Sequence, residues 1–369
     1  MAVVGAGVVG SAVALALARR GVAVALLDAE SQPGFGASGT NSGILHTGFD
    51  AMPGELETEL ILASASIREP VLAALGIPVL RCGAWLRSQD DSQQHALAAA
   101  ARANGVTVLE RPHATLEFPD EAVTDPVVYT LALAGAAVRH GAQLQTLCRV
   151  AAIERGDERM TLHTGDGGAV RCRVAVNCAG LEADSVARLA GDDSFEIFPR
   201  KGEFLVFDPP EGERLERIML PLPTKRTKGV LVFPTVDGKV IAGPTAVDQE
   251  DKHDWSVRPE AWEEIIPKAR SMYPPLKDAE PIAAYAGLRP AGRGSNYVIG
   301  PCRTYPRLVN VAAIRSTGLT ASLGIAQRVS EIVASLGVSL GREQELKPGS
   351  TPTTGLPWWR RTAEYTKAA

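Results

Sequence analysis

The hydrophobic pattern is most regular in the first thirty residues of the chain. Residues 1–4 are an apolar run that predicts a β-strand, and residues 11–20, rich in Ala and Leu, predict a helix. A second apolar run at residues 22–27 predicts another strand and ends at Asp28. Strand, helix, strand and acid in this order are typical of a nucleotide-binding βαβ unit.

Three glycines, Gly5, Gly7 and Gly10, join the first predicted strand to the helix. In a dinucleotide-binding unit the first permits a tight turn, the second lets the backbone approach a pyrophosphate, and the third lets helix pack on strand. The N-terminus of the helix attracts phosphates through its unpaired N–H groups. Asp28 follows at close to the spacing of about 20 residues expected for an acid that binds ribose hydroxyls. The stretch therefore predicts dinucleotide binding, and a glycine-rich loop without a ligand is the alternative.

Beyond Asp28, segments with helical periodicity alternate with β-type runs. Helices are predicted at residues 55–75, 91–104, 127–140, 259–272 and 318–336. Strands are predicted at residues 78–86, 142–154, 160–163, 170–173, 174–177, 198–208, 229–234, 239–243, 282–288, 297–299 and 308–312. Residues 117–126 are expected to form a polar linker, and the tail from Gly341 a surface extension. This order predicts an α/β fold in which a dinucleotide-binding lobe is interleaved with a sheet-rich lobe.

The composition is that of a soluble globular protein. The 369 residues are 45% hydrophobic and 22% charged, and the formal net charge is −4. No basic block indicates binding to nucleic acid. The five cysteines include no Cys-x-x-Cys pair, so we expect buried thiols in a reducing, cytoplasmic setting. We expect no disulfide frame and no metal site.

Two segments near the ends of the chain raise the question of membrane contact. Residues 2–18 are nearly all apolar and are followed by Arg19-Arg20, but three glycines interrupt them, no positive region precedes them and no cleavage site follows them. We therefore expect neither a signal peptide nor a membrane span there. Near the C-terminus, Trp358-Trp359-Arg360-Arg361 suggests at most a peripheral membrane contact or a partner surface. A tail packed on its own subunit is the preferred interpretation.

Residues 34–50 form an unusual run of Gly, Ser, Thr and Asn around one histidine, His46. Such small polar residues present backbone N–H and hydroxyl groups to a ligand at close range. Composition alone is equally compatible with a flexible surface loop, so the interpretation of this segment depends on the motifs around it.

Several motifs follow one another along the chain. Besides the N-terminal glycines and Asp28, they are Gly36-Ala-Ser38-Gly39, Asn177-Cys-Ala-Gly180, Gly287-Leu-Arg289-Pro290 and Gly318-Leu-Thr320. Together, over about residues 1–340, they resemble the D-amino-acid-oxidase-type superfamily of FAD-dependent oxidoreductases. Asp28 stands where a Glu is more usual in this superfamily, and either carboxylate accepts hydrogen bonds from ribose hydroxyls.

Other segments resemble one branch of this superfamily, the glycerol-3-phosphate dehydrogenases and oxidases. The segments are residues 40–50, Pro53-Gly54, Lys228-Gly-Val, residues 243–246 and residues 315–322. The L-2-hydroxyglutarate dehydrogenases share the Asn-Ser-Gly-x-x-His block, but Phe49-Asp50 is more similar to the glycerophosphate type.

The resemblance implies a glutathione-reductase-like architecture, in which an FAD-binding domain of Rossmann type is interleaved with a β-rich substrate domain. The implied FAD-binding domain comprises residues 1–77, 127–195 and 286–340. The implied substrate-binding domain comprises residues 78–126 and 196–285, and residues 341–369 form a C-terminal extension.

The resemblance also implies non-covalent FAD. The residues implied to contact it are Gly5, Gly7, Val8, Gly10, Asp28, Ala29, Ser38, Gly39, Thr40, Asn41, Ser42, Gly43, Val150, Ala179, Gly180, Gly318, Leu319 and Thr320. Among these, Gly318 opens a helix whose N–H groups and dipole would stabilise the reduced, anionic ring. A plain helix start capped by Thr317 is the alternative.

The implied reaction is oxidation of a C–OH group by hydride transfer to flavin N5. The substrate would be a small anionic metabolite, similar to glycerol 3-phosphate or a 2-hydroxy acid. His46 is implied as the base that takes the hydroxyl proton, because neutral imidazole suits that role near neutral pH. A structural histidine that holds the loop is the alternative.

Cationic side chains are implied to hold the anionic substrate. Lys228 and Arg289 are implied as catalytic and substrate-binding residues, and Arg315 and Ser316 as substrate contacts. Guanidinium forks match carboxylate and phosphate oxygens in pairs. Ordinary salt bridges and a solvated lysine are the alternatives for these positions. Two weaker candidates for the basic lining are Arg200 and Lys201.

Electrons are expected to pass from FAD to oxygen or a quinone-type acceptor, and a homo-oligomer is compatible with the sequence. Two other functions stay open at this point. One is an amine or amino-acid oxidase of the same superfamily, although such enzymes do not usually need a base at the position of His46. The other is a non-catalytic flavoprotein with a structural or electron-carrier role.

Overall fold

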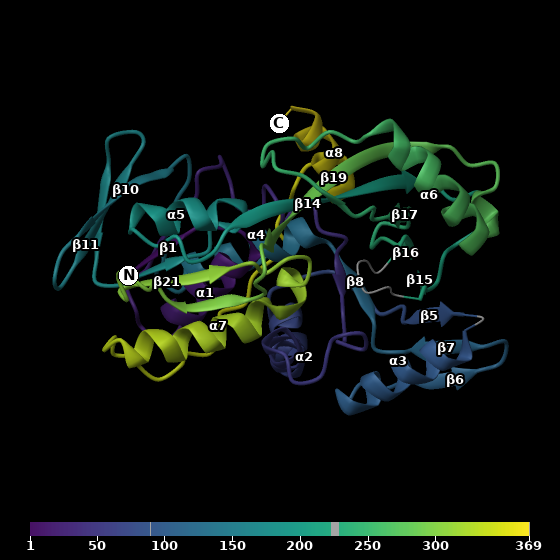
Figure 1. The fold of residues 1–369 in the computed structure, drawn as a ribbon, viewed down its shortest axis with the longest axis horizontal. Helices are drawn as coiled ribbons and strands as arrows, with labels where there is room; N and C mark the ends of the chain where they lie inside the picture. The colour runs from purple at the N-terminus through teal and green to yellow at the C-terminus, as the bar shows by residue number, and fades with distance from the viewer. Residues whose placement is uncertain (89, 223–228, 369) are drawn as a thin grey trace.

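The computed structural model describes residues 1–88, 90–222 and 229–368 (Figure 1). One half of the molecule is built on a six-stranded sheet. In this sheet β21, β13, β1, β2 and β9 run parallel, and β20 is antiparallel at one edge. In sheet order the strands are β20 (Val298–Pro301), β21 (Leu308–Ala312), β13 (Ala175–Asn177), β1 (Ala2–Val4), β2 (Ala25–Leu27) and β9 (Gln143–Gln145).

Both faces of this sheet are covered, as the continuous apolar strands require. On β1, Val3 faces the core formed with the helices, whereas Ala2 and Val4 face the core formed with a small antiparallel sheet and α5, because successive side chains of a strand alternate. The helices on the first side are α1 (Val8–Ala18), α2 (Leu56–Ala74), α4 (Pro126–Arg139) and α7 (Gly318–Ser335). On the second side lie β10 (Val150–Arg155), β11 (Met160–Thr164), β12 (Ala169–Cys172) and α5 (Ala183–Leu189), which follows the 3₁₀ turn η1 (Gly180–Glu182).

The other half of the molecule contains a nine-stranded sheet, built around two long antiparallel strands, β14 (Ile197–Phe207) and β19 (Pro281–Gly292). These two strands pair along nearly their whole length. They run from the side of the six-stranded sheet into the rest of the nine-stranded sheet (Figure 1). The remaining strands are β18 (Val247–Asp248), β17 (Val240–Gly243), β16 (Leu231–Pro234), β15 (Ile218–Leu220), β5 (Ala84–Arg87), β7 (Thr115–Phe118) and β6 (Leu109–Arg111).

Helices cover both ends of this sheet, in addition to the C-terminal helix described below. The apolar side of α6 (Pro259–Met272), together with the 3₁₀ turn η2 (Pro274–Leu276), covers one face, and α3 (Asp91–Ala103) lies over β5 and β7. A three-stranded sheet of β3 (Ile44–Leu45), β8 (Ala122–Thr124) and β4 (Val79–Leu80) joins three segments from the first third of the chain. This small sheet holds the residues just before His46.

Several expected elements differ from the structure. The single strand expected at 78–86 is divided into β4 and β5, because Gly83 turns the chain with a φ of +66°. The strand expected at 142–154 is likewise two strands in different sheets, with Leu147 at a positive φ between them. The prediction of a polar linker at residues 117–126 is wrong. These residues contain the end of β7 and all of β8, because their apolar residues pair with distant strands.

The C-terminal segment also differs from the expected surface extension. It ends in α8 (Trp358–Ala368), which packs on β19, as the preferred interpretation of a tail bound to its own subunit requires. Trp358 is only 2% exposed and meets Tyr285 edge-on, and the Trp359 indole N–H donates to Asp237 at 2.8 Å. These tryptophans are therefore part of the core rather than a membrane-facing patch.

The five cysteines are all buried and free of disulfides. Within the part of the chain that the structure describes, no helix has the length and apolar character needed to cross a bilayer.

We expect Trp358→Ala to lower the free energy of unfolding by about 3–5 kcal/mol, because it empties a fully packed site in the core. Urea unfolding followed by far-ultraviolet circular dichroism measures the change. Leu356→Ala, at a residue that is 37% exposed, is the control and should change stability by no more than about 0.5 kcal/mol. An unaltered midpoint for the Trp358 variant would show that α8 is not part of the folded core.

Candidate functional site

Two adjoining cavities lie where the halves of the molecule meet. The first, which we call the dinucleotide cleft, has a volume of about 400 Å³ and lies at the carboxyl ends of β1, β2 and β13. The second, which we call the His46 pocket, has a volume of about 430 Å³. Ala37, Asn41 and Arg315 line both cavities. Ligands of α/β sheets bind at this edge.

The glycine turn forms the floor of the dinucleotide cleft. Gly5 has a φ of +99°, and a Cβ on Gly10 would overlap the Gly5 carbonyl, so helix and turn pack as closely as the sequence predicts. Gly7 is the N-cap of α1 and provides no side-chain cap. The Val8 N–H donates to Ser38 Oγ at 2.9 Å, which brings the loop at residues 34–50 against the helix start. Most of this N-terminus therefore faces the cleft without a side-chain acceptor.

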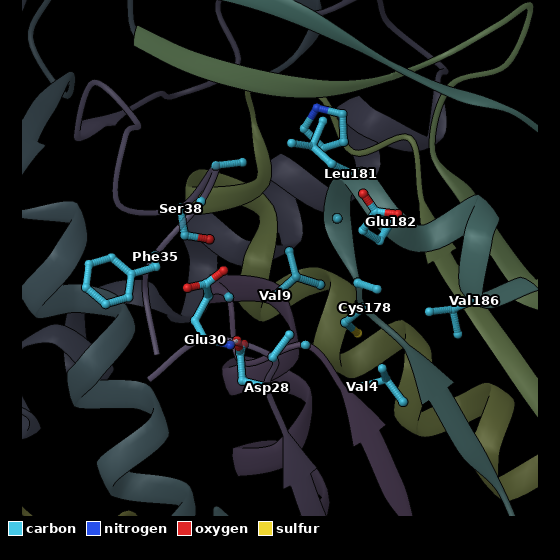
Figure 2. A pocket seen from close by; sticks show the side chains of 18 of the residues that line it. Val4, Val9, Asp28, Glu30, Phe35, Ser38, Cys178, Leu181, Glu182 and Val186 are labelled. Carbon is cyan, nitrogen blue, oxygen red and sulfur yellow. Dashed lines mark hydrogen bonds between the residues drawn. The ribbon is translucent and has the colours of Figure 1, made fainter. Parts of the chain in front are cut away.

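Asp28 lies beside this turn at the end of β2. Its carboxylate accepts hydrogen bonds from the backbone N–H of Ala6 at 2.5 Å and of Glu30 at 2.8 Å. Burial raises the pKa of Asp28, and these backbone hydrogen bonds oppose the rise. Figure 2 shows Phe35 and Ser38 on one side of the cleft and Leu181 with Glu182 on the other. The acid is thus held rigidly at the floor between the two walls.

The far wall comes from β13 and the residues after it. Asn177 is completely buried, and its amide donates to the Ala183 carbonyl at 2.7 Å and to Asn310 at 2.9 Å. These bonds fix the chain just before Ala179 and Gly180, which line the cleft. Burial raises the pKa of the Cys178 thiol far above its usual range, so this cysteine is an inert packing residue.

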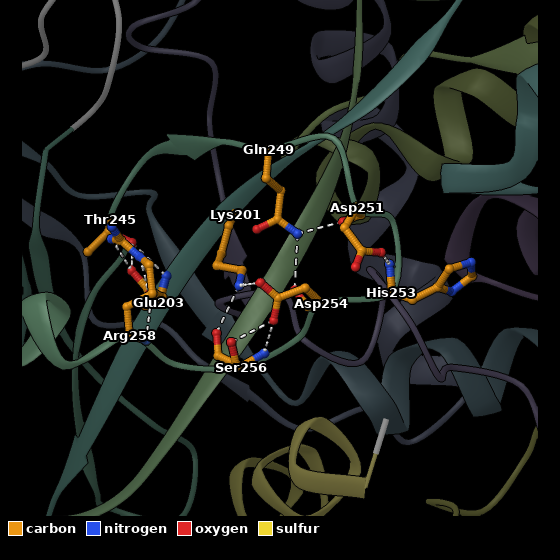
Figure 3. Close-up of polar contacts among 9 residues, drawn as sticks. All are labelled: Lys201, Glu203, Thr245, Gln249, Asp251, His253, Asp254, Ser256 and Arg258. Atoms are coloured by element: carbon orange, nitrogen blue, oxygen red, sulfur yellow. Dashed lines mark hydrogen bonds and ion pairs between the residues drawn. The ribbon is translucent and has the colours of Figure 1, made fainter.

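A segment from the sheet-rich half closes over the cleft. Lys252, His253 and Trp255 line it. The loop that carries them is tied down by Lys201, whose ammonium donates to Asp254 at 2.7 Å and to the Ser256 carbonyl at 3.0 Å (Figure 3).

Lys201 is therefore not part of a basic substrate lining. Its side chain is 1% exposed and reaches neither cavity, so this weaker candidate is wrong. The hydrogen bond from Lys201 lowers the pKa of Asp254 to about 2, with Ser256 contributing. The pair stabilises the loop rather than a substrate.

The C-terminal helix completes this side of the cleft. Tyr365 lines the cleft and stacks on Phe35 with ring centroids 4.8 Å apart, and it meets Trp255 edge-on at 5.6 Å. The Thr362 hydroxyl donates to the Gly39 carbonyl at 2.7 Å. The helix α8 thus holds the loop at residues 34–50 from outside.

His46 lies at the start of the second cavity. Its backbone N–H donates to Thr320 Oγ1 at 3.2 Å, and its Nδ1 lies 3.1 Å from Glu121 Oε2. The imidazole is 12% exposed, whereas Glu121 is fully buried. The other carboxylate oxygen of Glu121 accepts hydrogen bonds from Thr47, from its N–H at 2.6 Å and its hydroxyl at 2.9 Å. One imidazole edge is therefore occupied and the other is available to the pocket.

Arg289 is a cation of the His46 pocket without a carboxylate partner. It lies within β19 rather than after a strand, and its guanidinium donates to the Thr245 carbonyl at 2.9 Å. No carboxylate of the described residues is within 4.0 Å of it. Burial lowers the pKa of Arg289 to about 10, with the nearby Arg200 acting in the same direction, so it stays charged at neutral pH. A Cβ on Gly202 would overlap this guanidinium.

The other two arginines of the pocket are already paired. Arg200 makes two hydrogen bonds to Asp248, at 2.5 and 3.1 Å. Arg315 pairs with Glu57, which also accepts the Thr317 hydroxyl at 2.6 Å. Burial alone would raise the pKa of Glu57, but Arg315 and these hydrogen bonds lower it. Thr317 is the N-cap residue of α7, as the sequence predicts, but its hydroxyl donates to Glu57 and makes no cap hydrogen bond to the helix.

The structure brings most of the predicted residues to the two cavities. Those that line the dinucleotide cleft are Gly5, Gly7, Val8, Asp28, Ala29, Ser38, Asn41, Val150, Ala179, Gly180, Gly318 and Leu319, with Arg315. Those that line the His46 pocket are Thr40, Asn41, Ser42, His46, Arg289, Arg315 and Ser316. Four predicted residues line neither cavity: Gly10, Gly39, Gly43 and Thr320. Lys228 lies outside the described residues.

Several residues of the site were not predicted, and three of them make contacts that shape it: Glu121, Glu57 and Tyr365. Glu121 fell within the expected linker, and only its position before the apolar pair Ala122-Val123 indicates burial. Glu57 carries no sequence signal beyond its place in a helix. Tyr365 lies in a tail whose preceding residues are rich in Pro, Gly and Thr, and no local pattern points to the cleft.

Comparisons with known proteins agree with this geometry. The chain is 28% identical to a glycerol 3-phosphate dehydrogenase of Caloramator mitchellensis, over 94% of this chain and 76% of that protein. It is 26% identical to the mitochondrial L-2-hydroxyglutarate dehydrogenase of Arabidopsis thaliana, over 89% of this chain and 82% of that one.

Among solved structures, the fold is similar to dithionite-reduced L-α-glycerophosphate oxidase from Mycoplasma pneumoniae with FAD bound. The TM-score is 0.87 and the identity 25%, over 95% of this chain and 98% of that one. The family model described as FAD dependent oxidoreductase matches residues 1–332. With the uncapped turn of α1, the buried acid at the end of β2 and the pocket beside them, this match means that the chain belongs to the family of FAD-dependent oxidoreductases.

Proposed function

We propose that this FAD-dependent oxidoreductase oxidises a C–OH group of a small anionic metabolite, with His46 as the base. The observation that carries the proposal is that His46 and Arg289 line one pocket, which adjoins the dinucleotide cleft, and that Arg289 forms no ion pair with a carboxylate of the described residues. A glycerol 3-phosphate-like alcohol or a 2-hydroxy acid fits this combination of base and cation. The relatives named above, a glycerol 3-phosphate dehydrogenase and an L-2-hydroxyglutarate dehydrogenase, support the same substrate class.

The chain offers suitable groups for FAD along the dinucleotide cleft. Gly7, Val8 and Ser38 would hold the pyrophosphate at the start of α1, and Asp28 would hold the ribose. Val150 would contact the adenine end. FAD, when bound, supplies the two-electron oxidant that a C–OH substrate requires. We assign the binding as non-covalent.

The residues of the His46 pocket have separate tasks in this proposal. Arg289 binds the anionic end of the substrate, and Ser316 with Arg315 lines the same pocket. The hydroxyl proton of the substrate moves to Nε2 of His46, because Nδ1 faces Glu121. Lys228 stays a candidate from the resemblance alone. Oxygen or a quinone-type compound would then accept the electrons.

The parts of the chain that we assign to FAD binding and to substrate binding correspond to the two large sheets. We assign residues 1–77, 127–195 and 286–340 to FAD binding, and residues 78–126 and 196–285 to substrate binding. The six-stranded and nine-stranded sheets support this division, with β19 crossing from one part to the other. The extension 341–369 contributes Tyr365 to the cleft.

The direct test is anaerobic reduction of the purified FAD-loaded protein. Glycerol 3-phosphate or L-2-hydroxyglutarate should bleach the flavin absorbance in a stopped-flow instrument, whereas glycine and other amino acids should not. Bleaching by amino acids alone would instead make the protein an amine oxidase. No bleaching by any of these compounds or by lactate would favour a flavoprotein without a substrate of its own.

In the same assay His46→Gln should slow the reduction by about 10²–10⁴-fold, because a general base contributes about that much. FAD content should be unchanged, since the imidazole lines the other cavity. His163→Gln, at a half-exposed histidine of β11, is the matched control. Near-normal reduction of the His46 variant would remove this residue from the role of base.

Arg289→Ala should raise KM for an anionic substrate by about 10- to 100-fold, the loss expected for hydrogen bonds to a charged group. Steady-state kinetics with glycerol 3-phosphate and with uncharged glycerol separate the two effects, because only the anionic substrate should lose affinity. Arg328→Ala, on the exposed side of α7, is the control. Equal loss for both alcohols would mean that Arg289 shapes the pocket rather than binds the anion.

Tyr365→Ala should weaken FAD binding by about tenfold, because a stacked aromatic pair is worth roughly 1 kcal/mol beyond its buried area. Equilibrium titration of the apoprotein with FAD measures the dissociation constant. Glu364→Ala changes an exposed neighbour on the same helix and should leave it unaltered. An unchanged constant for the Tyr365 variant would exclude α8 from the cofactor site.

A further inference from the structure

Glu121 is a fully buried carboxylate next to the His46 pocket. It follows Asp120 in the short connection between β7 and β8, and its backbone is fixed because the Gly83 N–H donates to the Glu121 carbonyl at 2.8 Å. Its side chain reaches the loop at residues 34–50 and contacts His46 and Thr47. The position is therefore defined by two segments that lie about 75 residues apart in the sequence.

The contacts of this carboxylate are divided between its two oxygens. Oε1 accepts both donors of Thr47, and Oε2 faces His46 Nδ1 at 3.1 Å. Over the described ranges of the chain, His46 is the one basic side chain within ion-pair distance of Glu121. Burying a carboxylate costs several kcal/mol unless hydrogen bonds and charge compensate. A purely structural role would be served better by an apolar residue or by a lysine or arginine partner.

We propose that Glu121 is the positioning residue of His46, an inference that rests on the proposed function in which His46 is the base. Glu121 accepts the Nδ1–H of the neutral imidazole and so keeps the single ring proton on that nitrogen. The Nε2 lone pair is then directed to the pocket, where the hydroxyl proton of the substrate is taken. The carboxylate also stabilises the imidazolium that this proton transfer forms.

Thr47 makes the inference testable with one substitution, Glu121→Gln. The two donors of Thr47 require an acceptor, so they should fix the carbonyl oxygen of the new amide in the place of Oε1. The amide NH₂ then faces His46 and donates to Nδ1, which drives the ring proton to Nε2. The side chain keeps its size, but the imidazole can no longer accept a proton at the nitrogen that faces the pocket.

The tautomer is observable without substrate. In FAD-loaded protein labelled with ¹⁵N-histidine, long-range ¹H–¹⁵N spectra distinguish a protonated from an unprotonated ring nitrogen, and the spectrum of His46→Gln assigns the signal. We expect the proton on Nδ1 in the native protein and on Nε2 in Glu121→Gln. A proton on Nε2 in the native protein would overturn the inference even if the variant fails to fold.

Anaerobic reduction supplies the second readout. Glu121→Gln should slow flavin reduction by about 10²–10⁴-fold, as His46→Gln does, and the double variant should be no slower than either single one. The dissociation constant for substrate should change little. Near-normal reduction with the proton still on Nδ1 would overturn the role of Glu121, whereas normal reduction in His46→Gln would overturn the proposed function itself.

Glu117→Gln is the matched control. Glu117 is a buried glutamate of the neighbouring strand β7 and pairs with Arg111 at 2.6 Å and Arg217 at 3.2 Å, but it lines neither cavity. Its substitution should lower the melting temperature and leave both the tautomer and the reduction rate unchanged. A change of tautomer in this control would show that loss of any buried charge in this region disturbs His46.

Discussion

The arrangement of the site depends on how the loop at residues 34–50 is held. This segment has almost no secondary structure of its own, yet it lies between the two sheets and lines both cavities. Its backbone and side chains are fixed by five hydrogen-bonding residues from four other segments of the chain. The fixing hydrogen bonds are those of Ser38 with Val8, of Asn41 with Ser316, of His46 with Thr320, of Thr47 with Glu121 and of Gly39 with Thr362.

Fixing a loop in this way has a cost, because each ordered residue loses about 1–2 kcal/mol of backbone entropy. The hydrogen bonds to buried partners offset this loss of entropy. Two of them hold His46, the residue proposed as the base. His46 is held at its backbone by Thr320 and at its ring by Glu121. The imidazole is thus oriented by the fold itself, and such orientation is what the proposed role of His46 as a base requires.

The parts of this site that could be predicted from the sequence are those with local patterns. The βαβ unit with Gly5 and Asp28 follows from periodicity and spacing, and its helix and strands lie close to where they were expected. His46 and Arg289 were indicated by resemblance, and their common pocket follows only from the pairing of β14 with β19 and its junction with the loop.

The remaining parts depend on contacts between distant segments, which a single sequence does not encode visibly. Glu121 has a partner 75 residues earlier, and its own neighbourhood is polar enough to resemble a linker. Tyr365 reaches Phe35 across nearly the whole chain. Arg289 was expected after a strand because Pro290 follows it, yet that proline lies in β19 where it pairs with Pro199. The sheet tolerates both prolines because their carbonyls find other donors: the Arg315 N–H donates to Pro290 at 3.2 Å and the Gln249 N–H to Pro199 at 3.1 Å.

Charge is distributed unevenly between the cations of the pocket, and this decides which of them is available to a ligand. Arg200 and Arg315 are neutralised by Asp248 and Glu57, whereas Arg289 has only a carbonyl oxygen as its described partner. Burial and the nearby Arg200 both disfavour the charged form of Arg289, and for this reason the pKa of Arg289 is lowered. An anion bound there would offset both effects, which is why the proposed substrate is anionic although the net charge of the protein is −4.

The two helices that begin at the dinucleotide cleft, α1 and α7, also present groups to a ligand, namely the backbone N–H groups of their first turns. The N-cap of α1 is a glycine, and the hydroxyl of the α7 N-cap, Thr317, is engaged by Glu57. Neither helix start has a side-chain cap, although such a cap is commonly worth about 1 kcal/mol. A ligand rich in acceptor oxygens satisfies these N–H groups as well as a side chain would. In the first turn of α1 the Val8 N–H already has an acceptor, Ser38 Oγ. A dinucleotide that accepted hydrogen bonds from the other N–H groups of these two helix starts would couple cofactor binding to folding stability.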